Sequence, residues 1–181
     1  MGSLKEPDIS LEVKTMKLAL DANCIIYAVH PESESYSPMQ NILTRQSSGQ
    51  VELYVSLHTL YELEQKPDEA FELAKKLFPL PYWPIGKIEE LVGTINSMTG
   101  TFDDIRKNQA IQLELENLAK SGNDLRDRGA FIDSLHASMD AFVTKDKQLV
   151  GTWPAKRIFE RFQMRILRPE EVVKLMTHQN S

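Results

Sequence analysis

The chain has 181 residues, of which 41% are hydrophobic and 26% charged, and its formal net charge is −5 at pH 7. This acidic balance does not favour a protein that coats nucleic acid through general positive charge, and the single cysteine, Cys24, excludes an internal disulfide framework. Because the chain has no signal-peptide core and no apolar run of about eighteen residues, we expect a soluble, cytoplasmic protein that does not enter membranes.

The length fits one domain with a sizeable core. No internal repeat, low-complexity block or linker divides the chain. We therefore assign residues 16–181 to a single domain, and residues 1–15 to an N-terminal arm or a remnant of cloning that carries no functional weight.

Four segments have the apolar, β-rich character of strands. The first, residues 17–20, ends directly before Asp21, and the others are 51–56, 140–146 with its turn, and 164–168. The first strand is expected to be buried and parallel to its neighbours.

Helices are predicted between these strands from end signals and apolar spacing. We expect Ser37 to cap the first helix, with Pro38 in its first turn and Gly49 at its end. Ser56 is expected to cap the second helix and Pro67 to start the third. The predicted helices span 38–48, 57–65, 67–78, 87–98, 101–122, 124–139 and 169–176. The alternation predicts an α/β fold, a three-layer α/β/α sandwich around a central parallel sheet.

Two predicted strands are followed by acids, Asp21 and Asp146. In open parallel sheets ligands bind beyond the carboxyl ends of the strands, so both acids are candidates for a functional site. On the predicted helix 124–139, the spacing of the apolar residues places Asp127 at the rim of the core, where the helix dipole favours an anion. A helix acid without a ligand explains Asp127 equally well. Asp124, one turn earlier, is its expected neighbour.

Other acids are less clearly placed. On the helix after Ser56, periodicity does not choose between Glu62 and Glu64, and either is explained by surface exposure alone. His58, in the first turn of that helix, is expected to be structural or exposed. Asp133 is expected to be a solvated helix residue.

Basic side chains concentrate between residues 155 and 174. A solvated face explains them, and so does a phosphate-contacting patch beside an acidic site. They are Lys156, Arg157, Arg161, Arg165, Arg168 and Lys174.

Taken together, four stretches resemble a PIN domain, the fold of many metal-dependent ribonucleases, including the VapC-type toxins of bacterial toxin–antitoxin pairs. The stretches are LALDANCIIYAV, YVSLHTLYELEQ, DRGAFIDSLHASMDAFVTKD and RILRPEEVVKL. The order of the motifs carries the resemblance, which covers about residues 16–177.

The resemblance implies an Mg²⁺- or Mn²⁺-dependent endoribonuclease, with RNA as substrate, an antitoxin protein as a possible partner and a homodimer as the assembly. It selects Glu62 over Glu64. The four acids implied as catalytic and metal-binding are Asp21, Glu62, Asp127 and Asp146. The residues expected to orient them are Asn23, Thr144 and Asp124, and those expected to hold flanking phosphates are Lys145, Lys147, Arg126 and Arg128. The apolar segment 77–85 is a dimer face or part of the core.

Such a cluster of acids has a physical requirement. Two carboxylates about 4 Å apart repel by about 4 kcal/mol at an effective dielectric near 20, so the cluster takes up protons or binds cations. Oxygen ligands suit Mg²⁺ or Mn²⁺, and the lack of clustered Cys and His argues against zinc.

Two alternatives to the nuclease remain open. One is an inactive module of the same fold that binds RNA or a protein. The other is a phosphotransfer domain of the haloacid-dehalogenase or receiver type, although the former typically has Asp-x-Asp where this chain has Asp21-Ala-Asn23.

Overall fold

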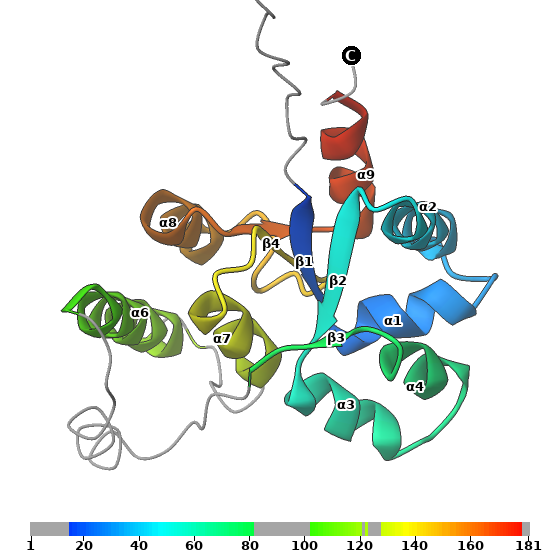
Figure 1. The fold of residues 1–181 in the computed structure, drawn as a ribbon. Helices are drawn as coiled ribbons and strands as arrows, with labels where there is room; N and C mark the ends of the chain where they lie inside the picture. The colour runs from blue at the N-terminus through cyan, green and yellow to red at the C-terminus, as the bar shows by residue number, and fades with distance from the viewer. Residues whose placement is uncertain (1–14, 82–101, 121, 123–127, 179–181) are drawn as a thin grey trace, which may run out of the picture.

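A computed structural model describes residues 15–81, 102–120, 122 and 128–178. Its centre is a five-stranded sheet in which all pairs of neighbouring strands are parallel, in the order β3-β2-β1-β4-β5 (Figure 1). The strands are β1 (Met16–Leu20), β2 (Val51–Val55), β3 (Phe78–Pro79), β4 (Ala141–Val143) and β5 (Arg165–Leu167). The predicted parallel α/β architecture is confirmed.

Helices cover both faces of the sheet (Figure 1). On one side pack α1 (Ala22–Val29), α2 (Tyr36–Ser47), α4 (Glu69–Ala74) and α9 (Pro169–His178), with α3 (Leu57–Glu64) at the carboxyl edge. On the other side pack α6 (Phe102–Lys120), α7 (Gly129–His136) and α8 (Trp153–Phe162). None of the helices in these ranges has the length and apolar character needed to cross a bilayer.

The two cores follow from the alternation of side chains along each strand. Leu18 and Leu20 of β1 face one core, whereas Ala19 between them faces the other. Likewise Val143 and Phe142 of β4 belong to opposite cores. Because these strands are buried on both faces, their sequences are continuously apolar, as expected for a central parallel sheet.

Two predicted helix starts were wrong by about one half-turn. The helix expected to start at Pro38 begins at Tyr36, because Ser35 rather than Ser37 precedes its first turn. The Ser35 hydroxyl donates to Glu170 at 2.6 Å instead of capping the helix. The helix expected from Pro67 begins at Glu69, with Asp68 accepting from the backbone as its N-cap. Ser56 does cap α3, as predicted.

The charged stretch near the C-terminus contains a helix, α8, that we did not predict. Thr152 is its N-cap residue, Pro154 lies in its first turn and Gln163 ends it in the left-handed region, with φ of 58°. Ala155, Ile158 and Phe162 pack on one core and recur at helical spacing, so the sequence does carry a signal for this helix.

A buried ion cluster joins α8 to α6. Glu114 of α6 is 2% exposed, and its carboxylate accepts hydrogen bonds from Arg157 at 2.7 and 3.0 Å and from Arg161 at 2.6 Å. The hydrogen bonds from Arg157, with those from Arg161, outweigh the effect of burial and lower the pKa of Glu114 from 4.5 to about 2. The charge of Glu114 therefore stabilises the packing of α6 on α8.

Glu114→Gln is expected to lower the free energy of unfolding near neutral pH by about 2 kcal/mol, because two guanidinium groups lose an anionic acceptor. An acid with a lowered pKa in the folded state stabilises the protein above its unfolded pKa, near 4.5, and this contribution disappears as the pH falls toward about 2. Urea unfolding should therefore show a difference from wild type that narrows between about pH 6 and pH 3. The matched control is Glu116→Gln, an exposed acid on the same helix; a difference that does not depend on pH would contradict the assignment.

Candidate functional site

The candidate site lies where two neighbouring strands end. β1 and β4 are hydrogen-bonded neighbours, and Leu20 is in register with Val143. The chain leaves β1 toward β2 on one side, while β4 lies on the other side, so the strand order changes direction at this point. Asp21 and Thr144 are the first residues beyond the two strands. Ligands of open parallel sheets bind at such a position.

Asp21 is fixed by the backbone and by Thr144. It is the N-cap of α1, and its carboxylate accepts from the amide of Ala22 at 2.9 Å and from the Thr144 hydroxyl at 2.5 Å. The same hydroxyl accepts from the amide of Asp146 at 3.1 Å. Thr144, which is completely buried, therefore connects the Asp21 carboxylate to the backbone of Asp146.

Burial dominates the electrostatics of Asp21. It raises the pKa of the carboxyl above its ordinary value, and the charge of Asp146 raises it further, although the Thr144 hydrogen bond and Arg128 act in the opposite direction. An ionised Asp21 is thus under-compensated by its surroundings. A cation placed beside it would be bound favourably.

Asp146 is compensated within the chain. Its carboxylate pairs with Arg128 at 2.6 Å and accepts from the amide of Gln148 at 2.7 Å. Arg128 also donates to the side chain of Gln148 at 2.7 Å. Arg128, expected from the sequence to hold phosphate, thus neutralises one of the acids expected to bind metal.

Glu62 shares a pocket with Asp21. The pocket has a volume of about 430 Å³ and lies between the end of β1, α3 and the start of α7. Burial and the charge of Asp21 raise the pKa of Glu62 above its ordinary value. Glu62 rather than Glu64 lies on this pocket, which agrees with the choice made from the resemblance. Its lining residues are Asp21, Asn23, His58, Thr59, Glu62, Gly129 and Ala130.

The donors around this pocket fit a hard divalent cation. The Oδ1 atom of Asn23, which lines the pocket, is buried and has no hydrogen-bond partner in the described part of the chain. With Asp21 and Glu62 it gives the pocket oxygen donors of the kind that Mg²⁺ and Mn²⁺ prefer. Among the described residues, no three Asp, Glu, His or Cys side chains are close enough to hold an ion by themselves. A complete ligand set therefore needs a further oxygen donor, which Asn23, water or Asp127 would supply.

The remaining expected site residues fall into two groups, those outside the described residues and two lysines within them. Asp127, Asp124 and Arg126 lie outside the described residues. Lys145 pairs with Glu34 at 2.6 Å and lies 3.6 Å from Glu170, so its charge is used within the chain. Lys147 is exposed.

Sequence reasoning missed a buried acid behind the pocket. Asp133, expected to be solvated, is 0% exposed, and its carboxylate lies 3.9 Å from Nε2 of His58. The His58 ring rests on Gly129, where an added Cβ would lie only 2.4 Å from a ring carbon. The only trace of the His58–Gly129 contact in the sequence is a glycine at the start of a helix. Such glycines are too common to identify a contact.

Gly129→Ala is expected to lower the free energy of unfolding by about 1–3 kcal/mol, because the new methyl group overlaps the His58 ring and forces it to move. Urea denaturation measures the loss, and the NMR signals of the His58 ring report the displacement. In a His58→Ala background the same change should cost much less. Equal costs in the two backgrounds would show that the ring contact is not responsible.

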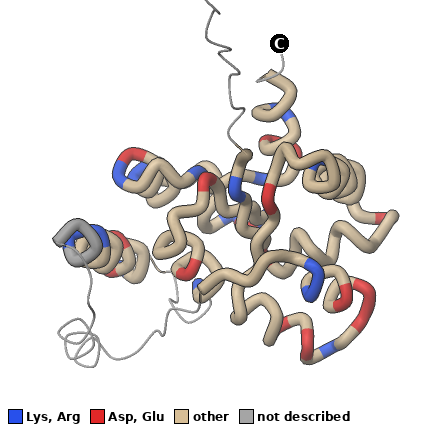
Figure 2. The backbone as a smooth tube through the Cα atoms, in the orientation of Figure 1, with Lys and Arg blue, Asp and Glu red and all other residues tan. Residues whose placement is uncertain are grey.

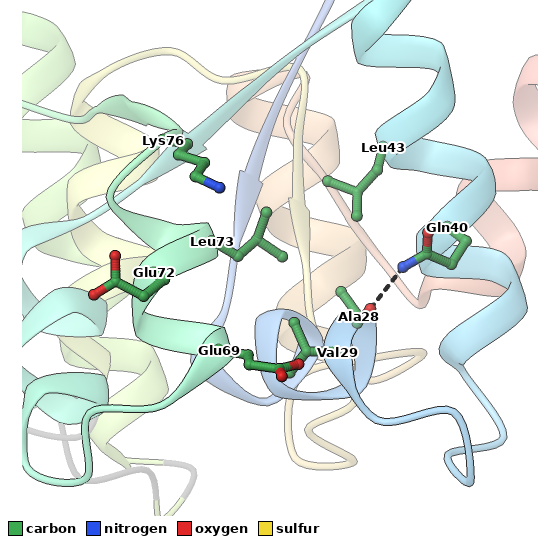
Figure 3. Close-up of a pocket in the computed structure, with 8 residues that line it drawn as sticks. All are labelled: Ala28, Val29, Gln40, Leu43, Glu69, Glu72, Leu73 and Lys76. Carbon is green, nitrogen blue, oxygen red and sulfur yellow. Dashed lines mark hydrogen bonds between the residues drawn. The ribbon is translucent and has the colours of Figure 1, made fainter.

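A second pocket, of about 380 Å³, lies between α1, α2 and α4 (Figure 3). Leu43 and Leu73 form its apolar wall, and Gln40 donates to the carbonyl of Ala28 at 2.7 Å. Glu69, Glu72 and Lys76 also line it, and Glu72 pairs with Lys75 at 2.6 Å. This pocket lacks strand-end acids, so it is a poorer candidate for an active site.

Comparisons with known proteins do not assign the chain to a family. No protein-family model matches the sequence, and no curated protein matches it. Any function must therefore be argued from the site itself and from the resemblance of its motifs.

Proposed function

We propose that this protein is a PIN-like endoribonuclease that uses Mg²⁺ or Mn²⁺ to hydrolyse RNA phosphodiester bonds. One observation carries the proposal: Asp21 and Asp146, beyond the ends of adjacent parallel strands, are joined through the Thr144 hydroxyl, and Asp21 shares a pocket with Glu62. Capping of α1 alone does not explain why half-buried Asp21 shares a polar pocket with a second acid.

In this proposal the acids hold the metal and Thr144 orients one of them. Asp21 and Glu62, the two acids on the pocket, would be ligands, with Asn23 supplying a neutral oxygen. Asp127, and Asp146 once it leaves Arg128, would complete the set. A bound divalent ion would supply Lewis-acid stabilisation of the charge that develops on the phosphate. The raised pKa values of Asp21 and Glu62, caused first by burial and then by a neighbouring acid, support this role, because a cation would compensate both charges.

Wild-type protein is expected to cleave single-stranded RNA with Mg²⁺ or Mn²⁺ and to lose this activity in EDTA. Gel analysis of end-labelled RNA measures cleavage, and restoring excess metal should restore it. A single-stranded DNA of the same sequence tests the substrate class. Several RNAs left intact with both metals would contradict the proposal.

A second candidate function is favoured by the Arg128–Asp146 ion pair, which already neutralises one acid. If this pair persists with metal present, the protein would be a non-catalytic module that binds RNA or a protein. Binding of RNA that does not change with EDTA, without cleavage in either metal, would support this candidate over the nuclease.

The resemblance extends the proposal to a cytoplasmic toxin with a small antitoxin partner and to a homodimer. In the described part of the segment 77–85, Phe78 is 51% exposed whereas Leu77 and Leu80 are buried. Phe78 is therefore the described residue of this segment that a dimer contact would cover. Sedimentation of wild type and Phe78→Ala tests the assembly, and co-purification with the product of a neighbouring gene tests the antitoxin.

A further inference from the structure

Trp153, the first residue of α8, is a large aromatic side chain that is 56% exposed. Arg157, one turn later, places its guanidinium 4.9 Å from the centre of the Trp153 ring. Trp153 lies outside the acid pocket and its ring is largely exposed, whereas Arg157 also binds Glu114 of α6.

The guanidinium of Arg157 is held in place by Glu114 of α6. Glu114 accepts two hydrogen bonds from Arg157 and one from Arg161, and both arginines remain about one third exposed. Nη1 of Arg157 and Nη2 of Arg161 make no hydrogen bond within the described residues. The surface formed by Trp153, Arg157 and Arg161, which we term the α8 platform, thus combines an ordered aromatic ring with cationic donors that are still available.

The platform follows the acid site along the chain. The carbonyl of Asp146 accepts from the amides of Leu149 and Val150, and the hydroxyl of Thr152 donates to the carbonyl of Leu149 at 2.8 Å. These contacts fix the short turn from Asp146 to the start of α8. Trp153 therefore follows Asp146 through an ordered segment of the chain.

We propose that the α8 platform binds a segment of single-stranded RNA next to the bond that is cleaved. A base would stack on Trp153, and neighbouring phosphates would accept from Arg157 and Arg161. This inference rests on the proposed function and names the single-stranded form of its substrate.

Charge favours RNA over a protein or a second copy of the chain as the occupant. Lys156, Arg157 and Arg161 of α8 face two acids, because Lys156 lies 3.9 Å from Glu160 and both arginines pair with Glu114 of α6, so the surface keeps a small excess of positive charge. Figure 2 shows basic and acidic positions on the α8 tube. Trp153 and Phe159 are the exposed large apolar side chains of α8 among the described residues, and they lie six positions apart. Stacking platforms with adjacent cations bind single strands without requiring a particular base.

Binding can be measured separately from cleavage. The chain has two tryptophans, so Trp83→Phe leaves Trp153 as the fluorescent reporter. In EDTA, oligouridine of about ten nucleotides is expected to quench this fluorescence. Trp153→Ala, measured with labelled oligouridine, should raise Kd about tenfold or more, whereas Trp153→Phe should stay within about threefold because its ring still stacks.

Trp153→Leu and Phe78→Ala are the matched controls. Leucine keeps an apolar side chain without the π-face and should bind as weakly as Trp153→Ala; Phe78 is an equally exposed aromatic on β3, at the opposite end of the sheet from α8's neighbour β5, and its loss tests the assembly separately from RNA binding. Unquenched Trp153 fluorescence, or equal affinity of wild type and Trp153→Ala, would overturn the proposal. Loss of a dimer in Trp153→Ala without loss of RNA affinity would assign the surface to a second copy instead. Failure of the nuclease proposal would appear separately, as absence of cleavage by wild type with metal.

Discussion

Asp21→Asn is expected to reduce metal-dependent RNA cleavage by about a thousandfold or more. The substitution keeps the size of the side chain but removes its negative charge. That charge accepts from Thr144 and lies on the pocket that Asp21 shares with Glu62. Initial rates with saturating Mn²⁺ measure the effect, and urea denaturation verifies that the variant folds.

The control is Asp68→Asn, which changes another helix N-cap acid. Asp68 accepts from the amides of Ala70 and Phe71 at the start of α4, as Asp21 caps α1, but it does not line the acid pocket. Its substitution should affect stability alone. If both variants cleave RNA at similar rates, Asp21 is only a helix cap.

Thr144→Val is expected to lower cleavage by about 10- to 100-fold, as the loss of a group that orients a metal ligand commonly does. Valine keeps the shape of the buried side chain but cannot donate to Asp21 or accept from the amide of Asp146. Because the Thr144 hydrogen bond lowers the pKa of Asp21, its loss should also raise that pKa. The acidic limb of the pH–rate profile should then move to higher pH.

Thr44→Val is the matched control for the hydroxyl. Thr44 lies on α2 and donates to the carbonyl of Gln40 at 2.9 Å, so it is a threonine with a bonded hydroxyl that does not contact Asp21. Its variant should keep the wild-type rate and pH profile. An unchanged pH profile in Thr144→Val would show that the hydroxyl does not control Asp21.

The two central strands were predictable because they are short and buried on both faces, whereas the edge strand β3 was not predicted and its Phe78 fell in a predicted helix. The apolar runs at 18–20 and 141–143, each followed by polar residues, predict strands of a parallel sheet without any knowledge of their pairing. The start of α2 was less predictable, because Ser35 and Ser37 are equally suitable caps and a distant residue, Glu170, decides the use of the Ser35 hydroxyl.

The site was predictable only in part. Strand ends identify Asp21 and Asp146, and the resemblance adds Glu62, since helical periodicity leaves Glu64 equally possible. The assignment of these acids to metal stays a prediction, as does that of Asp127. The Asp133–His58 contact and the Glu114 cluster join helices distant in sequence, and a charged residue in a helical pattern is normally read as exposed.

The central claim is that folding brings these acids around one divalent ion. A crystal structure of the protein grown with Mn²⁺, with anomalous scattering recorded, tests this directly. We expect an anomalous peak about 2.1–2.3 Å from an oxygen of Asp21, shared with at least one of Glu62, Asp127 and Asp146. A peak elsewhere, or no peak while Arg128 still pairs with Asp146, would contradict the claim.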